Sequence, residues 1–277
     1  MSFSILAGPF LDAYSTLYLR DFCTLVRNGR LSIGFEEEKL NSDYNKNYVM
    51  TTRLTELHKF DSFLFLFINP RFEAPILDLR LKIVSRQKSI WIFVLGSTSF
   101  ITHSVISLGN NLKSVINFVA GKNRMNNIFY KKDLCIFKGI QIYQRSDFSS
   151  IEKLLSVVTP KRLNALCEVN NLPVKASSVT ACDIGISNSV FVKKITKTWQ
   201  FVFGNNYLGF KKKGTSLIFV GLHHGSPAGA NADLIHPILT PFEQIGLYAN
   251  AMGIYRQVSK VISKDGKSKK INSFFLI

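Results

Sequence analysis

Two adjacent histidines, His223-His224, are the residues of this sequence that most directly suggest a metal site. Neighbouring side chains in a strand point to opposite faces, and no third or fourth ligand follows at a familiar spacing. A polar rim at a strand end therefore explains the pair better. The cysteines are too far apart for compact zinc or iron–sulfur spacing and indicate reduced core thiols: Cys23, Cys135, Cys167 and Cys182. We expect no metal site.

A second pattern has the glycine spacing of a phosphate-binding loop, Gly209 to Gly214 followed by Thr215-Ser216. It lacks the lysine that should follow the second glycine, and it precedes a strand instead of opening a helix. A basic hairpin turn is the better interpretation. No serine-nucleophile elbow and no dinucleotide-binding glycine fingerprint occurs.

Charge is the unusual feature of the composition. The 277 residues include 35 Lys and Arg against 18 Asp and Glu, a net charge of +17. Composition alone favours a ribosomal or other nucleic-acid-binding protein. Codon bias in an A+T-rich genome explains it equally well, because Lys, Asn, Ile, Phe and Tyr are abundant and Lys outnumbers Arg. The longest apolar run, Phe63 to Ile68, is far short of the ~20 residues of a membrane span, so no membrane insertion is expected.

Apolar runs and amphipathic segments alternate along the chain, which predicts an α/β fold with Rossmann-like, mainly parallel sheet layers and flanking helices. Asp12 is predicted to cap the first helix, Gly29 to end it in a left-handed conformation, and Asp147 to cap a later helix. The expected strands are 63–68, 90–95, 134–140, 200–203 and 217–220, and the expected helices are 14–25, 75–86, 112–119 and 148–158.

Residues 1–258 are predicted to form this α/β domain, as one body or as two lobes. The last stretch carries mostly lysine against a single acid, Asp265. We expect residues 259–277 to be a partly mobile basic tail.

Two segments carry far more specific patterns. The first is Phe67-Ile-Asn-Pro-Arg-Phe-Glu-Ala-Pro-Ile-Leu-Asp-Leu-Arg80, where a strand runs into a helix. The second is His223-His224-Gly225 with Ala232-Asp-Leu-Ile-His-Pro237 after it, and then Glu243, Gly246, Tyr248, Asn250, Gly253 and Gln257. In their order and spacing they resemble the molybdopterin-oxidoreductase-like domain of the large iron–sulfur subunit of respiratory complex I. The resemblance covers roughly residues 5 to 258.

The resemblance implies a partner. In that family the iron–sulfur clusters are bound by cysteines of an N-terminal half that has no counterpart here. We therefore expect a separate chain carrying the iron–sulfur half, together with other subunits of the peripheral arm, as partners, and no nucleic acid. The codon bias suits a split subunit encoded in the mitochondrion, on the matrix side of the inner membrane. Within complex I, which transfers electrons from NADH to ubiquinone, the chain would be structural and non-catalytic.

The resemblance also implies where a molybdopterin cofactor would lie, across the carboxyl ends of the strands. The family's cofactor binders typically have a glycine where this chain has Phe67, whose ring would occupy ligand space, and an acidic residue where it has Gly96-Ser97. Leu247 and Met252 likewise replace polar residues. We expect no cofactor and a vestigial pocket, with these candidate residues: Phe67, Asn69, Arg71, Glu73, Gly96, His223 and His224. Asn69 is expected to cap the next turn, and Arg71 and Glu73 to pair with each other or with adjoining loops.

Two alternatives remain open from the sequence. A working molybdopterin oxidoreductase fragment would hold stoichiometric molybdenum. A basic mitochondrial ribosomal or RNA-binding protein would bind RNA with strong salt dependence.

Overall fold

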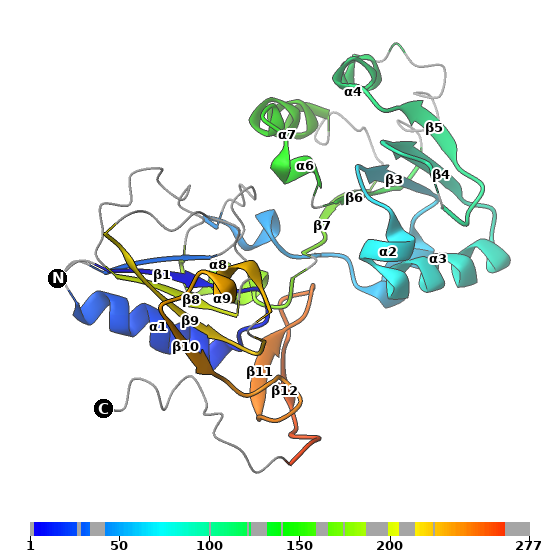
Figure 1. Cartoon of the computed structure of the whole chain (residues 1–277). Helices are drawn as coiled ribbons and strands as arrows, with labels where there is room; N and C mark the ends of the chain where they lie inside the picture. Colours follow the sequence, from blue (N-terminus) through cyan, green and yellow to red (C-terminus); the bar gives the residue numbers. More distant parts are fainter. Residues whose placement is uncertain are drawn as a thin grey trace. The chain divides into compact units, whose positions relative to one another are not determined.

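The chain folds into two compact units, seen in the computed structural model in Figure 1. The first unit combines residues 1–43 with 175–277, and the second, 44–174, is inserted between them in the sequence. The predicted range 1–258 thus contributes to both units. The structure describes residues 3–26, 29–33, 42–99, 101–120, 122, 132–139, 141–158, 166–173, 175–186, 199–204, 214–223 and 225–263.

The first unit is built on a five-stranded parallel sheet with the order β10-β9-β8-β1-β2. Its strands are β1 (Phe3–Ala7), β2 (Gly29–Ile33), β8 (Trp199–Phe203), β9 (Ser216–Gly221) and β10 (Leu234–Pro237). An antiparallel hairpin, β11 (Gly246–Ala249) and β12 (Tyr255–Val258), follows. Its helices are α1 (Ala13–Leu25), α8 (Ser178–Asp183) and α9 (Pro227–Ala230).

The first helix begins as predicted and ends differently. The Asp12 carboxylate accepts a hydrogen bond from the Ser15 amide at 3.3 Å, which satisfies a free donor of the first turn. The prediction that Gly29 ends this helix in a left-handed conformation was wrong. The helix ends at Leu25, and Gly29 begins β2. A glycine stands here because there is no room for a side chain: a Cβ on Gly29 would lie 2.7 Å from Cζ of Phe3.

The second unit is built on another five-stranded parallel sheet, with the order β5-β4-β3-β6-β7. Figure 1 shows α3 on one side of this sheet and α4 and α7 on the other. Its strands are β3 (Ser62–Leu66), β4 (Trp91–Leu95), β5 (Ile106–Gly109), β6 (Leu134–Lys138) and β7 (Cys167–Asn171). Its helices are η1 (Asn45–Asn47), η2 (Leu54–Lys59), α2 (Pro70–Glu73), α3 (Pro75–Gln87), α4 (Leu112–Val119), α6 (Gln141–Gln144) and α7 (Phe148–Val158).

The predicted strands and helices all occur, within a few residues of their expected ends, and the parallel α/β class is confirmed. The continuous apolar character of β3 is explained by burial on both faces, since every side chain from Ser62 to Leu66 is buried. Phe63, Phe65, Phe93 and Phe137 are fully buried in this core. Each such burial stabilises the fold by about 1.5–3 kcal/mol.

Strand β7 was not predicted, because its sequence, Cys-Glu-Val-Asn-Asn, is more polar than that of a typical buried strand. Its two asparagines are nevertheless buried, and tertiary hydrogen bonds satisfy them. Asn170 Oδ1 accepts from the Thr52 amide at 2.8 Å, and Asn171 Nδ2 donates to the Lys46 carbonyl at 2.7 Å. Both partners lie more than a hundred residues away, so no local pattern could indicate them.

Candidate functional site

The order of strands in the second unit locates a crevice. The chain passes from β3 outward through β4 to β5, and then returns to β6 on the other side of β3. In sheets of this kind ligands bind outside the carboxyl ends of the strands, where the direction of winding reverses. That place lies between the ends of β3 and β6, next to Phe67 and Gly139.

Phe67 stands at this position in a left-handed backbone conformation, with φ of +50°. The conformation favours glycine, and it costs about 1–2 kcal/mol for other residues. The backbone is held on both sides. The Phe67 amide donates to the Leu95 carbonyl at 2.7 Å, and a Cβ added to Gly139 would lie 2.4 Å from the Phe67 carbonyl oxygen. A Cβ on Gly96 would lie 3.2 Å from Phe67 Cα.

The ring of Phe67 is buried, with 9% of the residue exposed, and the guanidinium of Arg145 lies 4.9 Å from its centroid. Arg145 lies after β6 and α6, and Phe67 lies directly after β3. Side chains that follow the two strands therefore contact each other at the crevice. Two hydrogen bonds of 2.8 Å tie Arg145 to the Asp147 carboxylate. They raise the pKa of Arg145 and lower that of Asp147. The carboxylate of Asp147, predicted as a helix cap, thus serves to hold this arginine.

The Asn-Pro-Arg motif forms a tight turn after β3. Asn69 Oδ1 accepts from the Arg71 amide at 3.2 Å and caps α2, as predicted, while Asn69 Nδ2 donates to the Ser99 carbonyl at 2.8 Å. Glu73 Oε1 accepts from the Asn69 amide at 3.0 Å, which closes the turn. Arg71 extends into solvent, with its guanidinium over the Phe72 ring. The side chains of Asn69 and Glu73 therefore stabilise the turn itself.

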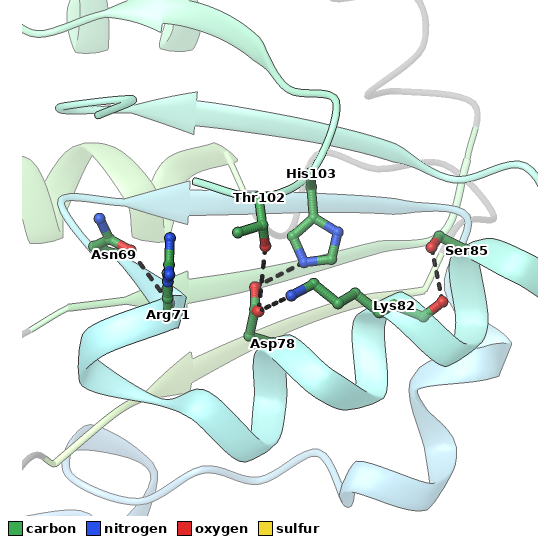
Figure 2. A network of polar contacts seen from close by, with 7 residues as sticks. All are labelled: Asn69, Arg71, Asp78, Lys82, Ser85, Thr102 and His103. Atoms are coloured by element: carbon green, nitrogen blue, oxygen red, sulfur yellow. Dashed lines mark hydrogen bonds and ion pairs between the residues drawn. The ribbon is translucent and has the colours of Figure 1, made fainter. Parts of the chain in front are cut away.

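A buried polar network that sequence reasoning missed lies beneath α3 (Figure 2). Asp78 faces the sheet and pairs with His103 Nε2 at 2.8 Å and with Lys82 Nζ at 2.8 Å, and Thr102 donates to it at 3.3 Å. Burial raises the pKa of Asp78, but its bonds to Lys82 and His103 outweigh that effect and lower it overall. The network fastens the segment before β5 to α3.

A pocket of about 450 Å³ opens beside this network. It is lined mainly by polar side chains from the second half of α3 and from the segments before β4 and β5: Lys82, Ser85, Arg86, Ser89, Ile90, Ile92, Thr102, His103 and Ser104. Asp78 already pairs with both Lys82 and His103, so part of the positive charge here is neutralised within the chain.

Lys138 is a second group that the sequence did not single out. It ends β6 and is buried, with Nζ 3.4 Å from Glu152 Oε1 and 6.0 Å from the Tyr143 ring centroid. Burial lowers the pKa of Lys138, because the charged form loses hydration. A lysine at a predicted strand end gives no sequence signal of this kind, since strand-end lysines usually face water.

The seven predicted pocket residues are not brought together by one unit. Phe67, Asn69, Arg71, Glu73 and Gly96 gather after β3 and β4 in the second unit. His223 belongs to the first unit, where it is exposed after β9, and His224 lies outside the described residues. Within the part of the chain that the structure describes, no group of three His, Cys, Asp or Glu side chains is arranged to hold a metal ion.

The first unit has its own reversal point, between β1 and β8. Gly8 follows β1 and Gly204 follows β8, and a Cβ on Gly8 would lie 2.3 Å from the Gly204 carbonyl oxygen. Gly204 has φ of +57°, and Ser177 Oγ donates to the Gly8 carbonyl at 3.1 Å. The two strand ends therefore meet backbone to backbone.

No helix in the described ranges has the length and apolarity needed to cross a membrane.

Comparison with known proteins agrees with this architecture. The molybdopterin oxidoreductase family profile matches residues 2–275. One chain of the formyltransferase/hydrolase complex from Methylorubrum extorquens, solved with methylofuran, superimposes with a TM-score of 0.66 at 11% identity. The alignment covers 97% of this chain and 88% of that one. At such low identity the likeness concerns the fold alone.

Curated relatives specify the branch of the family. The NADH-ubiquinone oxidoreductase 75 kDa subunit of Reclinomonas americana is 25% identical over 83% of this chain, and that of Acanthamoeba castellanii 26% over 95%. An NADH-quinone oxidoreductase subunit of Rickettsia conorii is 26% identical over 96%. The chain covers 35%, 38% and 40% of these relatives, respectively, in their C-terminal portion. The chain belongs to the molybdopterin oxidoreductase family, and its relatives there include the large subunits of NADH:quinone oxidoreductases.

Proposed function

We propose that this chain is a structural, non-catalytic subunit of the peripheral matrix arm of mitochondrial respiratory complex I. The observation that carries the proposal is its similarity, along 83–96% of its length, to large subunits of NADH:quinone oxidoreductases. The two motifs around Asn69-Pro70-Arg71 and His223-His224-Gly225 support the same assignment. Two of the relatives are named as 75 kDa subunits of NADH-ubiquinone oxidoreductase, which favours the mitochondrial form of the complex.

The partner in this proposal is a second polypeptide that carries the iron–sulfur half of the large subunit. The chain covers at most 40% of the length of these relatives, and the family resemblance implies an iron–sulfur half elsewhere in the complex. The four cysteines of this chain are separated in sequence, and none of these described residues forms a disulfide. Cluster ligands would therefore come from the partner chain, and this chain would pack against it and against other peripheral-arm subunits.

The non-catalytic part of the proposal rests on the crevice between β3 and β6. The nucleotide portion of a molybdopterin cofactor needs close access to backbone there, which a glycine would provide. Phe67 supplies a buried ring instead, and the Arg145 guanidinium lies over it. The residues present do not fit the cofactor, so we assign no chemical step to this crevice and regard it as vestigial.

The first test is native electrophoresis of gently solubilised mitochondria, with mass spectrometry locating this chain. We expect it to migrate with NADH dehydrogenase activity and with a separate, cysteine-rich iron–sulfur polypeptide. Migration with ribosomes would overturn the proposal in favour of RNA binding. Such a result would mean that the net charge of +17 serves to bind RNA.

Metal analysis of the same band tests the non-catalytic part separately. We expect iron from the partner chain, and molybdenum well below one atom per copy of this chain. Stoichiometric molybdenum that follows this chain through dissociation of the complex would show a cofactor site. It would leave the complex I assignment intact while refuting the vestigial crevice.

A further inference from the structure

The second unit exposes a row of large apolar side chains on α2 and α3, and we call this row the α3 seam. It consists of Phe72 (65% exposed), Ile76 (65%), Leu79 (59%) and Ile83 (40%). Within α3 the spacing is 3 and 4 residues, as between a and d positions of a heptad, and Phe72 precedes these residues on α2, which non-helical Ala74 separates from α3. At 100° per residue, the three members in α3 lie within about 60° of the helix circumference.

This row lies opposite the face by which α3 joins the sheet. Leu77, Leu81 and Val84 are buried, and Asp78 points to the same side to meet His103. An ordinary surface helix has charged or polar residues opposite its core face. Helix α3 is apolar on both sides, which indicates that its outer face is also covered by protein.

The charges around the seam are all of one sign. Arg71, Arg80 and Arg86 are exposed beside it. The acidic residues of this segment do not balance them at the surface, because Asp78 is buried and Glu73 accepts from the Asn69 amide. In heptad terms Arg80 occupies a flanking e position, where charge selects the partner helix.

We propose that the α3 seam docks a helix of another subunit, and that this helix carries apolar residues at heptad spacing flanked by Asp or Glu. The identity of that subunit as part of complex I rests on the proposed function. The chemistry of the contact rests on the seam itself: a narrow apolar row takes another helix, and the arginines require carboxylates opposite.

A second copy of this chain fits the seam poorly. A twofold contact would bring the same arginines face to face, which is unfavourable. The seam offers on the order of 400 Å² of apolar surface, about half of the roughly 800 Å² that each partner buries in a stable complex. It suits the apolar centre of a larger contact. A membrane surface fits poorly too, because interfacial helices insert a broad apolar face and not a narrow row.

The native complex can be tested without any substitution. A carbodiimide joins lysine amines directly to neighbouring carboxylates, and Lys82 lies on α3 in a flanking g position. Its intrachain link to Asp78, 2.8 Å away, is an internal reference for the reaction. We expect an additional link from Lys82 to an Asp or Glu beside apolar heptad positions of another subunit's helix.

Variants test the apolar contact. A tagged full-length chain is imported into mitochondria, and the fraction that enters the complex is measured. For the double variant Ile76→Ser with Leu79→Ser we expect about a tenfold loss of incorporation. Leu25→Ser is the matched control, because Leu25 is 82% exposed on α1 of the other unit and should leave incorporation unchanged. For Arg80→Glu we expect a smaller, about threefold loss that reflects the charge alone.

Normal incorporation of the double variant would overturn the inference. So would Lys82 links confined to a second copy of this chain, or flotation of the wild-type chain with phosphatidylcholine–cardiolipin vesicles that the double variant abolishes. If the double variant is degraded, the Lys82 crosslink in the wild-type complex decides whether the seam contacts another subunit's helix. A wild-type chain absent from the NADH dehydrogenase band refutes the proposed function, whereas a complex that assembles regardless of the seam refutes this inference alone.

Discussion

The two sheets reverse their winding in the same way, but the strand ends at the two reversal points differ in one residue. In the first unit Gly204, after β8, has φ of +57° and meets Gly8, after β1. In the second unit Phe67, after β3, has φ of +50° and meets Gly139, after β6. By strand order Phe67 corresponds to Gly8 and Gly139 corresponds to Gly204, so the left-handed residue follows β3 in the second unit and β8 in the first.

The difference shows that a left-handed residue can stand at either strand end of a reversal point and need not be glycine. Phe67 bears a conformational cost of about 1–2 kcal/mol. Burial of its ring and the overlying Arg145 offset that cost. Glycine at this position would leave the crevice open, whereas phenylalanine closes it with its own side chain. Substitutions at both reversal points test this difference, and the two tryptophans report on them separately, Trp199 in the first unit and Trp91 in the second.

The largest effect is expected where two backbones touch. Gly8→Ala and Gly139→Ala would each place a Cβ within 2.3–2.4 Å of a carbonyl oxygen, and neither strand end can move without breaking its sheet. We expect the free energy of unfolding to fall by about 3 kcal/mol in the affected unit. Urea unfolding is followed by Trp199 fluorescence for the first variant and by Trp91 for the second.

Gly225→Ala is the control for both, because a Cβ there meets nothing within 4 Å. Its effect should stay within about 0.5 kcal/mol. Equal effects of all three substitutions would contradict the close backbone approach at the reversal points.

Phe67→Gly places a glycine at both strand ends of the second reversal point, as in the first. Removal of the buried ring costs about 3–5 kcal/mol, and relief of the left-handed conformation returns about 1–2 kcal/mol. We expect a net destabilisation of about 2 kcal/mol, reported by Trp91 in urea unfolding. A more stable variant would mean that the ring is not part of the packed core.

Gly204→Ala introduces strain without a clash, since the nearest atom to its Cβ is 4.0 Å away, on Leu11. With φ of +57°, the expected loss is about 1 kcal/mol, well below that of Gly8→Ala on the same Trp199 signal. Equal losses at the two positions would show that conformation, and not contact, limits both glycines.

The smallest effect is expected for Arg145→Gln, which removes the cation over Phe67 and the partner of Asp147. We expect about 0.5–1 kcal/mol at pH 7. Arg145 lowers the pKa of Asp147, so this pair stabilises the fold above the ordinary aspartate pKa and ceases to do so as pH falls through the lowered value. The difference between wild type and Arg145→Gln should therefore shrink below about pH 4. A difference independent of pH would exclude the ion pair as its source.

The site was predictable to the extent that it depends on local sequence. The cap by Asn69 and the turn into α3 follow from neighbouring residues, and Phe67 was singled out by comparison with the family's usual glycine. The Asp78–His103 pair did not follow, because its members lie twenty-five residues apart and no periodicity connects them. Lys138 was missed for a similar reason, since its burial depends on α6 and α7 packing over the end of β6.

By itself the sequence determined the α/β class, several central strands and the longer helices, and the family, because hydrophobic periodicity and two uncommon motifs are local properties of the chain. Tertiary structure alone decided that the strands form two separate sheets, which residues meet at each reversal point, and that Arg145 lies over Phe67. The physical reason is the same in each case. Parallel strands pair across long crossovers, so their order and their meeting points depend on the packing of the whole unit and leave no trace in neighbouring residues.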